Sequence, residues 1–306
     1  MSEFLRVQEI GKESYFWAEI SSSGDLFFRG DNGQEILNWA REERPTARET
    51  LEATFPLVRY EHVKPRLEIG EYHPRIWRPG RSPSPQVEYK SAWADSVHAA
   101  DTIFVRLQEL VRFIEPSSKN HKAYGHECRN LLLLAATEVE SGWKGVLRAN
   151  NYSAKSPWTI RNYVELLDAM RLADWEIAFG NYDDFKAIRP FHPWAAGSPG
   201  TPLAWYQAYN AVKHDREAEF AQGTLEHVLS ACAAVYVMVI AQFGQFAPRG
   251  DGVGTDLRIV QMHNAQEARF HNVFRPVKEP IWLLEELYAP PAVAGRSNWQ
   301  EKTLWP

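Results

Sequence analysis

The chain has 306 residues, 44% of them hydrophobic and 24% charged, which is typical of a soluble protein with one large domain or two ordinary ones. Its net charge of −5 excludes a global basic field for nucleic acid and leaves only a local patch for such binding. Cys128 and Cys232 lie in apolar helical patterns. We therefore expect buried free thiols, no disulfide framework and, since no signal peptide is visible at the N-terminus, a cytoplasmic location.

Residues 1–90 predict a region of mixed α and β structure. The segments SYFWAEIS and DLFFRG have strand composition, and SSSG between them predicts a turn. In GQEILNWAREE the apolar residues follow a helical spacing. Thr46, followed three residues later by Glu49, predicts the N-cap of a further helix. The basic, proline-rich segment HPRIWRPGRSPSPQ predicts a linker, so we place a boundary near residue 90.

Residues 91–248 predict a bundle of helices. A first helix starts at Asp95 as N-cap and ends before Pro116. The segment RNLLLLAATEVESGW is apolar around most of a helix, as a central helix would be. A short third helix follows Ser156 as its cap, with Pro157 at its first position. A long loop rich in proline and aromatic residues then leads to the segment WYQAYNAVKHDR.

The longest apolar run, VLSACAAVYVMVIAQF, is shorter than the roughly 20 residues of a membrane span. It predicts a buried core helix and no membrane partner. Residues 249–306 have mixed character, with DLRIVQMH and ARFHNVFRPV as strand candidates and a proline- and tryptophan-rich C-terminal extension expected to pack on the bundle. The predicted fold class is mainly α: an antiparallel helical bundle with irregular or β-containing N- and C-terminal flanks.

The segment WYQAYNAVKHDR gathers the polar residues with the clearest chemical meaning. On one helix Asn210 and His214 are neighbours, with Lys213 at the margin of their face, whereas Arg216 lies with Trp205 and Tyr209. For phosphodiester chemistry His214 would take a proton from a 2′-hydroxyl, Lys213 would stabilise charge on the phosphate and Asn210 would orient the imidazole. The alternative is a solvated helix face without catalytic function.

Three charged residues, Arg129, Glu138 and Glu140, lie within the apolar central helix. Charges in such surroundings are usually paired, and Lys213 and Arg216 are the expected partners of the two glutamates. Either a carboxylate orients the histidine–lysine group, or an interhelical salt bridge fixes the register of the bundle; the second reading is favoured.

The order of these helices, with RNLLLLAATEVESGWKGVL before WYQAYNAVKHDR, resembles the HEPN superfamily over residues 95–245. The resemblance implies a HEPN-like helical bundle, a role in toxin–antitoxin or antiphage defence and a homodimer whose motif helices face each other. Active HEPN members are metal-independent ribonucleases with an arginine, often followed by a polar residue, and then a histidine. His214 matches the histidine and Asn210 the polar residue, but Tyr209 stands at the place of the arginine, so the motif is degenerate.

Other site patterns are weaker. His121, His126 and Cys128 do not share a helix face, His263 and His271 are eight residues apart, and no glycine-rich phosphate loop precedes a helix, so we expect no metal and no cofactor. The basic stretch Arg75–Pro83 could touch RNA, although a solvated linker is the commoner role. Three functions stay open: a metal-independent endoribonuclease, a non-catalytic domain that binds RNA, a nucleotide or a partner protein, and a structural dimerisation bundle.

Overall fold

The structure of the protein is a computed structural model. The structure describes residues 2–12, 15–30, 33–39, 46–56, 59–80, 82–83, 88–155, 157–180, 182–194, 203–244 and 273–306. The chain divides into two compact units, each built from separate stretches of sequence. Unit 1 comprises residues 1–73, 78–83 and 282–302, and unit 2 comprises residues 74–77, 84–281 and 303–306. We predicted three successive regions, 1–90, 91–248 and 249–306. The units are not successive in this way, because each of them contains residues from both the first and the last of these regions.

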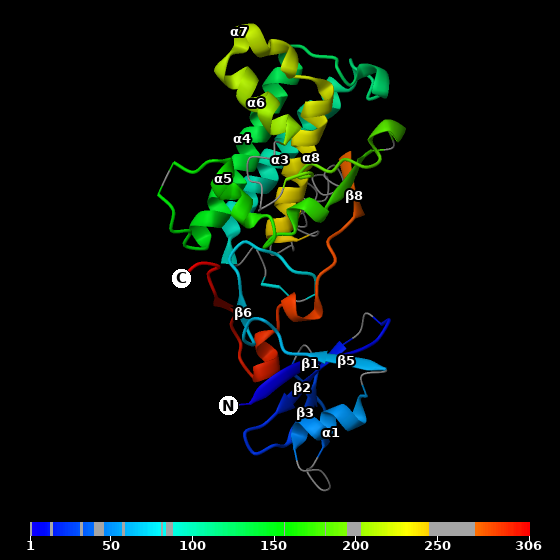
Figure 1. Ribbon diagram of the computed structural model, residues 1–306, viewed down its shortest axis with the longest axis vertical. Coiled ribbons are helices and arrows are strands. Elements are labelled where there is room, and N and C mark those ends of the chain that lie inside the picture. The colour runs from blue at the N-terminus through cyan, green and yellow to red at the C-terminus, as the bar shows by residue number, and fades with distance from the viewer. Residues whose placement is uncertain are drawn as a thin grey trace, which may run out of the picture. The chain divides into compact units, whose positions relative to one another are not determined.

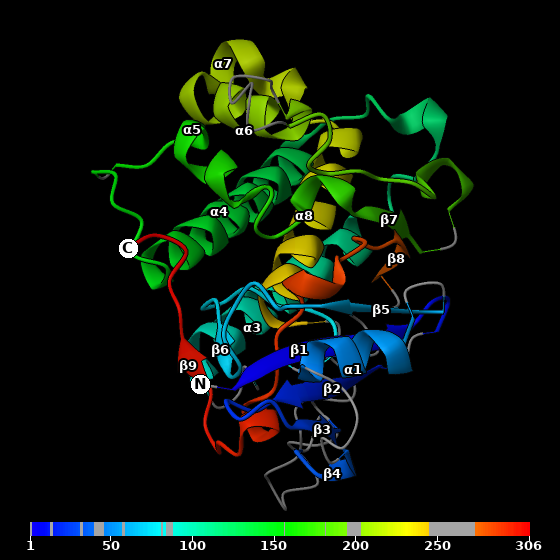
Figure 2. The same ribbon diagram turned by 60° about the horizontal axis from the view of Figure 1, so that its bottom comes forward.

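Unit 1 is built on a five-stranded antiparallel sheet with strand order β4-β3-β2-β1-β5 (Figures 1 and 2). Its strands are β1 (Glu3–Glu9), β2 (Tyr15–Ile20), β3 (Leu26–Arg29), β4 (Glu35–Trp39) and β5 (Tyr60–Val63). The helix α1 (Ala47–Thr54) begins at Thr46, whose side chain accepts a hydrogen bond from the backbone N–H of Glu49, so the predicted cap is confirmed. A short parallel pair joins β6 (Glu71–Tyr72) to β9 (Gln300–Glu301).

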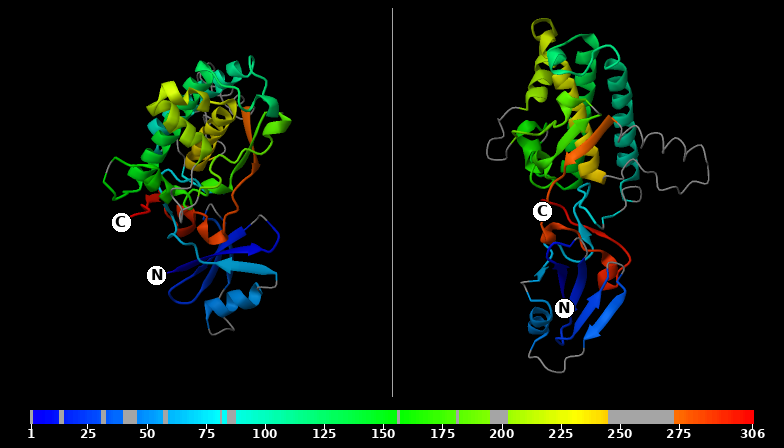
Figure 3. Two further views of the ribbon diagram at one scale, coloured as in Figure 1. Left: turned by 45° about the horizontal axis from the view of Figure 1, so that its top comes forward. Right: turned by 90° about the vertical axis from the view of Figure 1, so that its right-hand side faces the viewer.

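The two faces of this sheet bury different partners because side chains alternate along each strand. Leu5 and Val7 of β1 lie in one apolar cluster with Leu51 of α1. On the other face Trp17 packs with Val293, from the C-terminal stretch of unit 1. The sheet is therefore the middle layer between α1 and residues 282–302, as the right-hand view of Figure 3 shows.

A buried arginine joins β1 to this C-terminal stretch. Arg6 has no exposed surface, and its guanidinium donates hydrogen bonds to the carbonyl oxygens of Leu284 at 2.7 Å and Tyr288 at 2.9 Å. It also lies 4.5 Å from the ring centroids of both Tyr15 and Trp17. A charge taken fully out of water is stable only with such partners, so Arg6 fixes where residues 284–288 cross the sheet.

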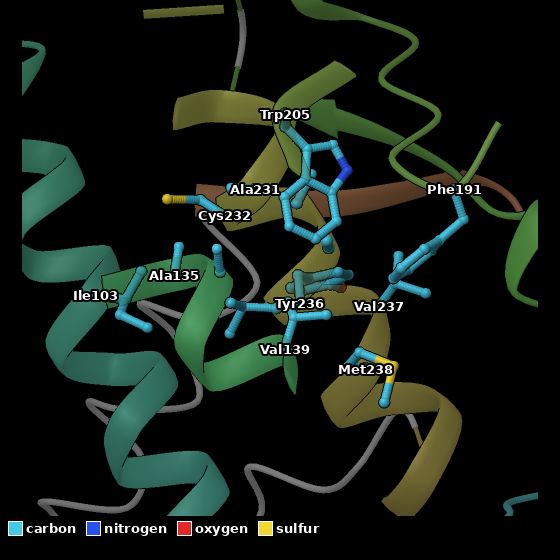
Figure 4. Packing of buried hydrophobic residues seen from close by; sticks show 14 of the residues in the cluster. Ile103, Ala135, Val139, Phe191, Trp205, Ala231, Cys232, Tyr236, Val237 and Met238 are labelled. Carbon is cyan, nitrogen blue, oxygen red and sulfur yellow. The ribbon is translucent and has the colours of Figure 1, made fainter. Parts of the chain in front are cut away.

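Unit 2 surrounds the helix α8 with other helices (Figure 1). Its helices are α3 (Lys90–Leu110), α4 (His126–Ala149), α5 (Ile160–Tyr163), α6 (Ala204–His214), α7 (Arg216–Glu219) and α8 (Leu225–Phe243). The strands β7 (Glu176–Phe179) and β8 (Phe274–Lys278) form an antiparallel pair. Figure 4 shows Ile103 of α3 and Val139 of α4 packing with Tyr236 of α8 in the apolar core.

The helix α8 is the core helix that its sequence predicted. Cys232 and Tyr236 at its centre have no exposed surface. Among the described residues α8 is the one helix long and apolar enough to cross a membrane, and 83% of that stretch is buried inside the protein. Burial on all sides explains its nearly uniform apolar composition, because each face meets another element of unit 2.

The predicted fold class, a mainly α HEPN-like antiparallel bundle with irregular or β-containing flanks, is wrong. Helices make up 47% and strands 15% of a mixed α/β structure. Unit 1 is organised by a sheet, and unit 2 contains the β7–β8 pair. Most of β8 falls in the predicted strand ARFHNVFRPV, whereas β7 was not predicted. Residues 35–39, predicted as part of a helix, form β4 because they pair with β3. The strand candidate DLRIVQMH and the cap Ser156 lie outside the described residues.

Two further boundaries differ from the prediction. The helix α3 begins at Lys90, five residues before Asp95, and Tyr89 at its N-cap provides no side-chain hydrogen bond. Two residues of the predicted linker are buried inside the units: Ile76 is 3% and Arg78 7% exposed. Arg78 lies 3.9 Å from the ring centroid of Trp282, within unit 1. The described part of this segment is therefore packed and is not a solvated linker.

Candidate functional site

The helix that carries the candidate residues ends earlier than predicted. α6 stops at His214, and Asp215 leaves the helical conformation with φ −136° and ψ 81°. The Asp215 carboxylate then accepts a hydrogen bond from the N–H of Ala218 at 3.0 Å and so caps α7. Arg216 is the first residue of α7 and is exposed. It is not part of the α6 surface on which we predicted it to lie with Tyr209.

One face of α6 forms a polar group with α4. The Nζ of Lys213 donates to the hydroxyl oxygen of Tyr209 at 2.8 Å, and this hydrogen bond is the chief cause of a raised Lys213 pKa. The hydroxyl of Tyr206 donates to Glu140 at 2.6 Å, and the same carboxylate pairs with Lys144 at 3.2 Å. Burial, more than this hydrogen bond, raises the pKa of Tyr206. Lys144 and Tyr206, not Lys213 and Arg216, are therefore the hydrogen-bonding partners of Glu140.

Asn210 and Arg129 make backbone contacts on the same helix. Asn210 donates its side-chain amide to the carbonyl oxygen of Tyr206 at 3.0 Å, one turn back. Arg129, from the first turn of α4, donates to the carbonyl oxygen of Val212 at 3.4 Å. The last carbonyls of a helix have no partner within it, so a cation at this place stabilises the C-terminal end of α6. Arg129 is thus a residue that positions the turn carrying His214.

The opposite face of α6 opens onto a hollow of about 480 Å³. His214 lies on this hollow together with Gln207, and Ala208 and Ala211 form its apolar part. Ala204, at the start of α6, also lines it. The remaining described lining residues come from the segment after α6 and from α8, and they are Asp215, Glu219, Gln222 and His227. Of the four residues predicted as catalytic, His214 alone is among the described lining residues.

His227 was not a candidate in the sequence, yet it shares the hollow with His214. Its Nδ1 lies 2.8 Å from the carbonyl oxygen of Gln222. A carbonyl oxygen only accepts hydrogen bonds, so Nδ1 carries a proton, and in the neutral ring Nε2 is the nitrogen with the lone pair. The sequence feature that could have predicted this is the short connection between the two helices, because it brings the end of α6 close to the start of α8.

Glu138, the other predicted carboxylate, lies elsewhere on α4 and interacts with a half-buried arginine, Arg75. Burial raises the pKa of Glu138, and the charge of Arg75 opposes that shift in part. Burial also lowers the pKa of Arg75 to about 10. The Arg75 guanidinium donates to the side-chain oxygen of Gln242 at 3.0 Å and lies against Gly145, where no Cβ obstructs it. Within unit 2, therefore, the side chain of Arg75 is committed to protein contacts rather than to RNA.

The raised pKa of Glu138 gives a stability prediction. The folded state favours the protonated carboxyl, so its contribution to stability is present below the unfolded pKa, near 4.5, and is lost as pH rises through the folded pKa. We expect Glu138→Gln to raise the melting temperature at pH 7 and to have no effect at pH 3.5 or so, well below that value. Thermal unfolding followed by circular dichroism at both pH values measures this. Thr137→Ser, one residue away and exposed, is the control; a lower melting temperature of Glu138→Gln at pH 7 would contradict the prediction.

In the described residues no group of three or more metal-ligating side chains is close enough to hold a metal ion. His214, Glu219 and His227 line the hollow from different elements without forming such a group. The residues present thus define a histidine-lined hollow on an α-helical unit, joined in one chain to a β-sheet unit. Comparison of the chain with protein-family models, with curated proteins and with solved structures finds no match. The resemblance to the HEPN superfamily rests on its quoted residues alone.

Proposed function

We propose that unit 2 is a non-catalytic binding domain whose hollow beside His214 receives a positively charged side chain of a partner protein. The observation that carries this proposal is the chemistry of the lining. Two carboxylates, Asp215 and Glu219, lie on the hollow, and its described lining contains no lysine or arginine. A partner with a lysine or arginine would meet opposite charge on entering, which favours both capture and specificity.

The position of the hollow on α6 supports the same ligand. The C-terminal end of a helix carries partial negative charge, and His214 is the last residue of α6. Ala208 and Ala211 offer an apolar surface beside the carboxylates. A lysine or arginine side chain combines a cationic head with an aliphatic stem, so it suits a site with both features.

The backbone at the start of α8 argues against a phosphate in this place. A helix start binds an anion through free N–H groups. Here the N–H of Leu225 donates to the carbonyl of Ala123, that of Glu226 to the carbonyl of His121, and that of His227 to the side chain of Thr224. These donors are occupied within the protein, so a phosphate would find few partners.

The test is a binding titration with arginine-containing peptides. We expect an unstructured peptide with one arginine to shift the NMR signals of His214 and His227, and its citrulline counterpart, which lacks the charge, to bind at least tenfold more weakly. Glu219→Gln is expected to weaken arginine-peptide binding, and rising salt should do the same. Glu217→Gln, exposed on α7 but absent from the described lining, is the matched control. Equal affinity of wild type and Glu219→Gln for the arginine peptide would refute the proposal.

A second candidate function, metal-independent RNA cleavage, is favoured by one observation: His227 joins His214 on the hollow. Two imidazoles can act as the general base and the general acid of phosphodiester cleavage. Under this candidate, RNA is cleaved in the presence of EDTA, and His214→Ala and His227→Ala each abolish the cleavage. Lys213→Ala retains activity, because Lys213 is held by Tyr209 outside the described lining. Equal cleavage by wild type and both histidine variants would end this candidate and leave the binding proposal standing.

A further inference from the structure

A second hollow, of about 570 Å³, lies between the end of α3 and the start of α4. Beside it Phe113 projects into solvent with 86% of its surface exposed. The exposed ring and the apolar floor of the hollow beside it together form an apolar surface, whose burial by a partner would be favourable. The described lining of this hollow includes no residue of α6, so it is a different surface from the proposed binding site.

The hollow lies along two rows of side chains on neighbouring helices. Arg106, Leu110 and Phe113 follow one another at helical spacing on α3 and the turn after it. Leu131 on α4 forms the apolar floor with Leu110, and these two side chains are 3% and 8% exposed. The surface therefore combines a projecting apolar side chain, Phe113, with an apolar depression beside it, whose floor is Leu110 and Leu131.

The rim of the hollow carries charges of both signs. Arg106, Glu109 and Glu127 line it and are exposed. Within the described part of the chain these three side chains form no ion pair. A partner of one charge sign would satisfy only some of them. A second copy of the same surface, turned about a two-fold axis, presents a glutamate to each arginine and an arginine to a glutamate.

We propose that two copies of the chain pair through this α3–α4 surface about a two-fold axis. Phe113 of each copy enters the hollow of the other, over Leu110 and Leu131. Arg106 of each copy faces the partner's Glu127 across the rim. This pairing leaves α6 outside the interface, in contrast to the facing motif helices that the HEPN resemblance implied.

The test is the oligomeric state of the full chain, measured by sedimentation equilibrium over a range of concentrations. We expect wild type to be a dimer, and Phe113→Ser to weaken the dissociation constant at least tenfold. Arg106→Glu should weaken pairing, and Arg106→Glu combined with Glu127→Arg should restore it, which a general loss of stability cannot produce. Ile281→Ser, which removes another exposed apolar side chain of unit 2 at 78% exposure, is the matched control and should leave the dimer intact.

Two outcomes would overturn the proposal. One is a wild-type chain that stays monomeric at its highest soluble concentration, which would leave the surface for a different partner. The other is a dimer that Phe113→Ser and Arg106→Glu both leave unchanged, which would place the contact elsewhere. Neither result bears on the arginine-peptide titration, so the two proposals can fail separately.

Discussion

Replacing Arg6 by methionine is expected to lower the free energy of unfolding of unit 1 by roughly 2–6 kcal/mol, because each of the two carbonyls that lose a charged donor costs about 1–3 kcal/mol. The carbonyls of Leu284 and Tyr288 would lose the donor that now lies 2.7 and 2.9 Å away. Methionine would still fill part of the space between Tyr15 and Trp17, so the effect reports on the hydrogen bonds and the cation–π contacts more than on packing.

Two comparisons sharpen this experiment. Arg6→Lys keeps the charge, but one ammonium group lacks the planar fork that reaches two carbonyls between two rings, so we expect it to be destabilising as well. Arg48→Met removes an arginine of α1 whose side chain is 59% exposed, and it should change stability by less than about 0.5 kcal/mol. Hydrogen exchange of the β1 amides reports on unit 1 specifically. Unchanged protection of these amides in Arg6→Met would contradict the expected result.

The largest effect in unit 2 is expected for Trp143→Ala, which should lower the free energy of unfolding by about 3–5 kcal/mol. Trp143 on α4 has no exposed surface. Its ring centroid lies 5.0 Å from that of Tyr163, 5.3 Å from Trp194 and 5.8 Å from Tyr206. Removing the indole leaves a cavity that these rigid rings can fill only in part.

Trp143→Phe is the informative intermediate variant. The indole N–H of Trp143 has no hydrogen-bond partner among the described residues, so phenylalanine loses packing but no hydrogen bond there. We expect it to cost about half as much as alanine. Tyr124→Ala removes an aromatic ring that is 55% exposed and should stay within about 0.5 kcal/mol of wild type. Urea unfolding measures all three, and equal stability of Trp143→Ala and Tyr124→Ala would show that the aromatic cluster does not support unit 2.

Elements with strong local signals could be predicted from the sequence. Thr46 caps α1 because its hydroxyl needs only the N–H three residues ahead, and α8 is apolar enough to be recognised as a core helix. Residues 35–39 could not be assigned in this way. Their apolar spacing suits a helix, but pairing with β3, which the local pattern does not contain, makes them a strand. The short strand β7 was missed for the same reason, since its partner β8 lies nearly a hundred residues later in the chain.

The site shows a similar division between local and non-local information. His214, predicted from the sequence, lines the hollow, but the prediction placed Lys213 beside it and extended the helix to Arg216. Consecutive residues on a helix point about 100° apart, so Lys213 and His214 point in different directions. Lys213 lies on the same face as Tyr209, four residues earlier, and donates a hydrogen bond to it. The end of α6 at Asp215 separates Arg216 from that helix. Predicting that His227 lines the same hollow requires the path of the chain between α7 and α8, and the pattern of a single helix does not contain it.

The distance along the sequence between Arg6 and Tyr288, 282 residues, has a consequence for how the protein is made. Synthesis adds roughly 5–20 residues per second, so β1 leaves the ribosome on the order of ten seconds or more before the carbonyls that receive its arginine. During that interval the sheet face with Trp17 and Arg6 lacks its C-terminal cover. The newborn chain therefore passes through a period in which this surface is open to chaperones or to other chains, and during it the charge of Arg6 lies on the uncovered face without its two carbonyl acceptors.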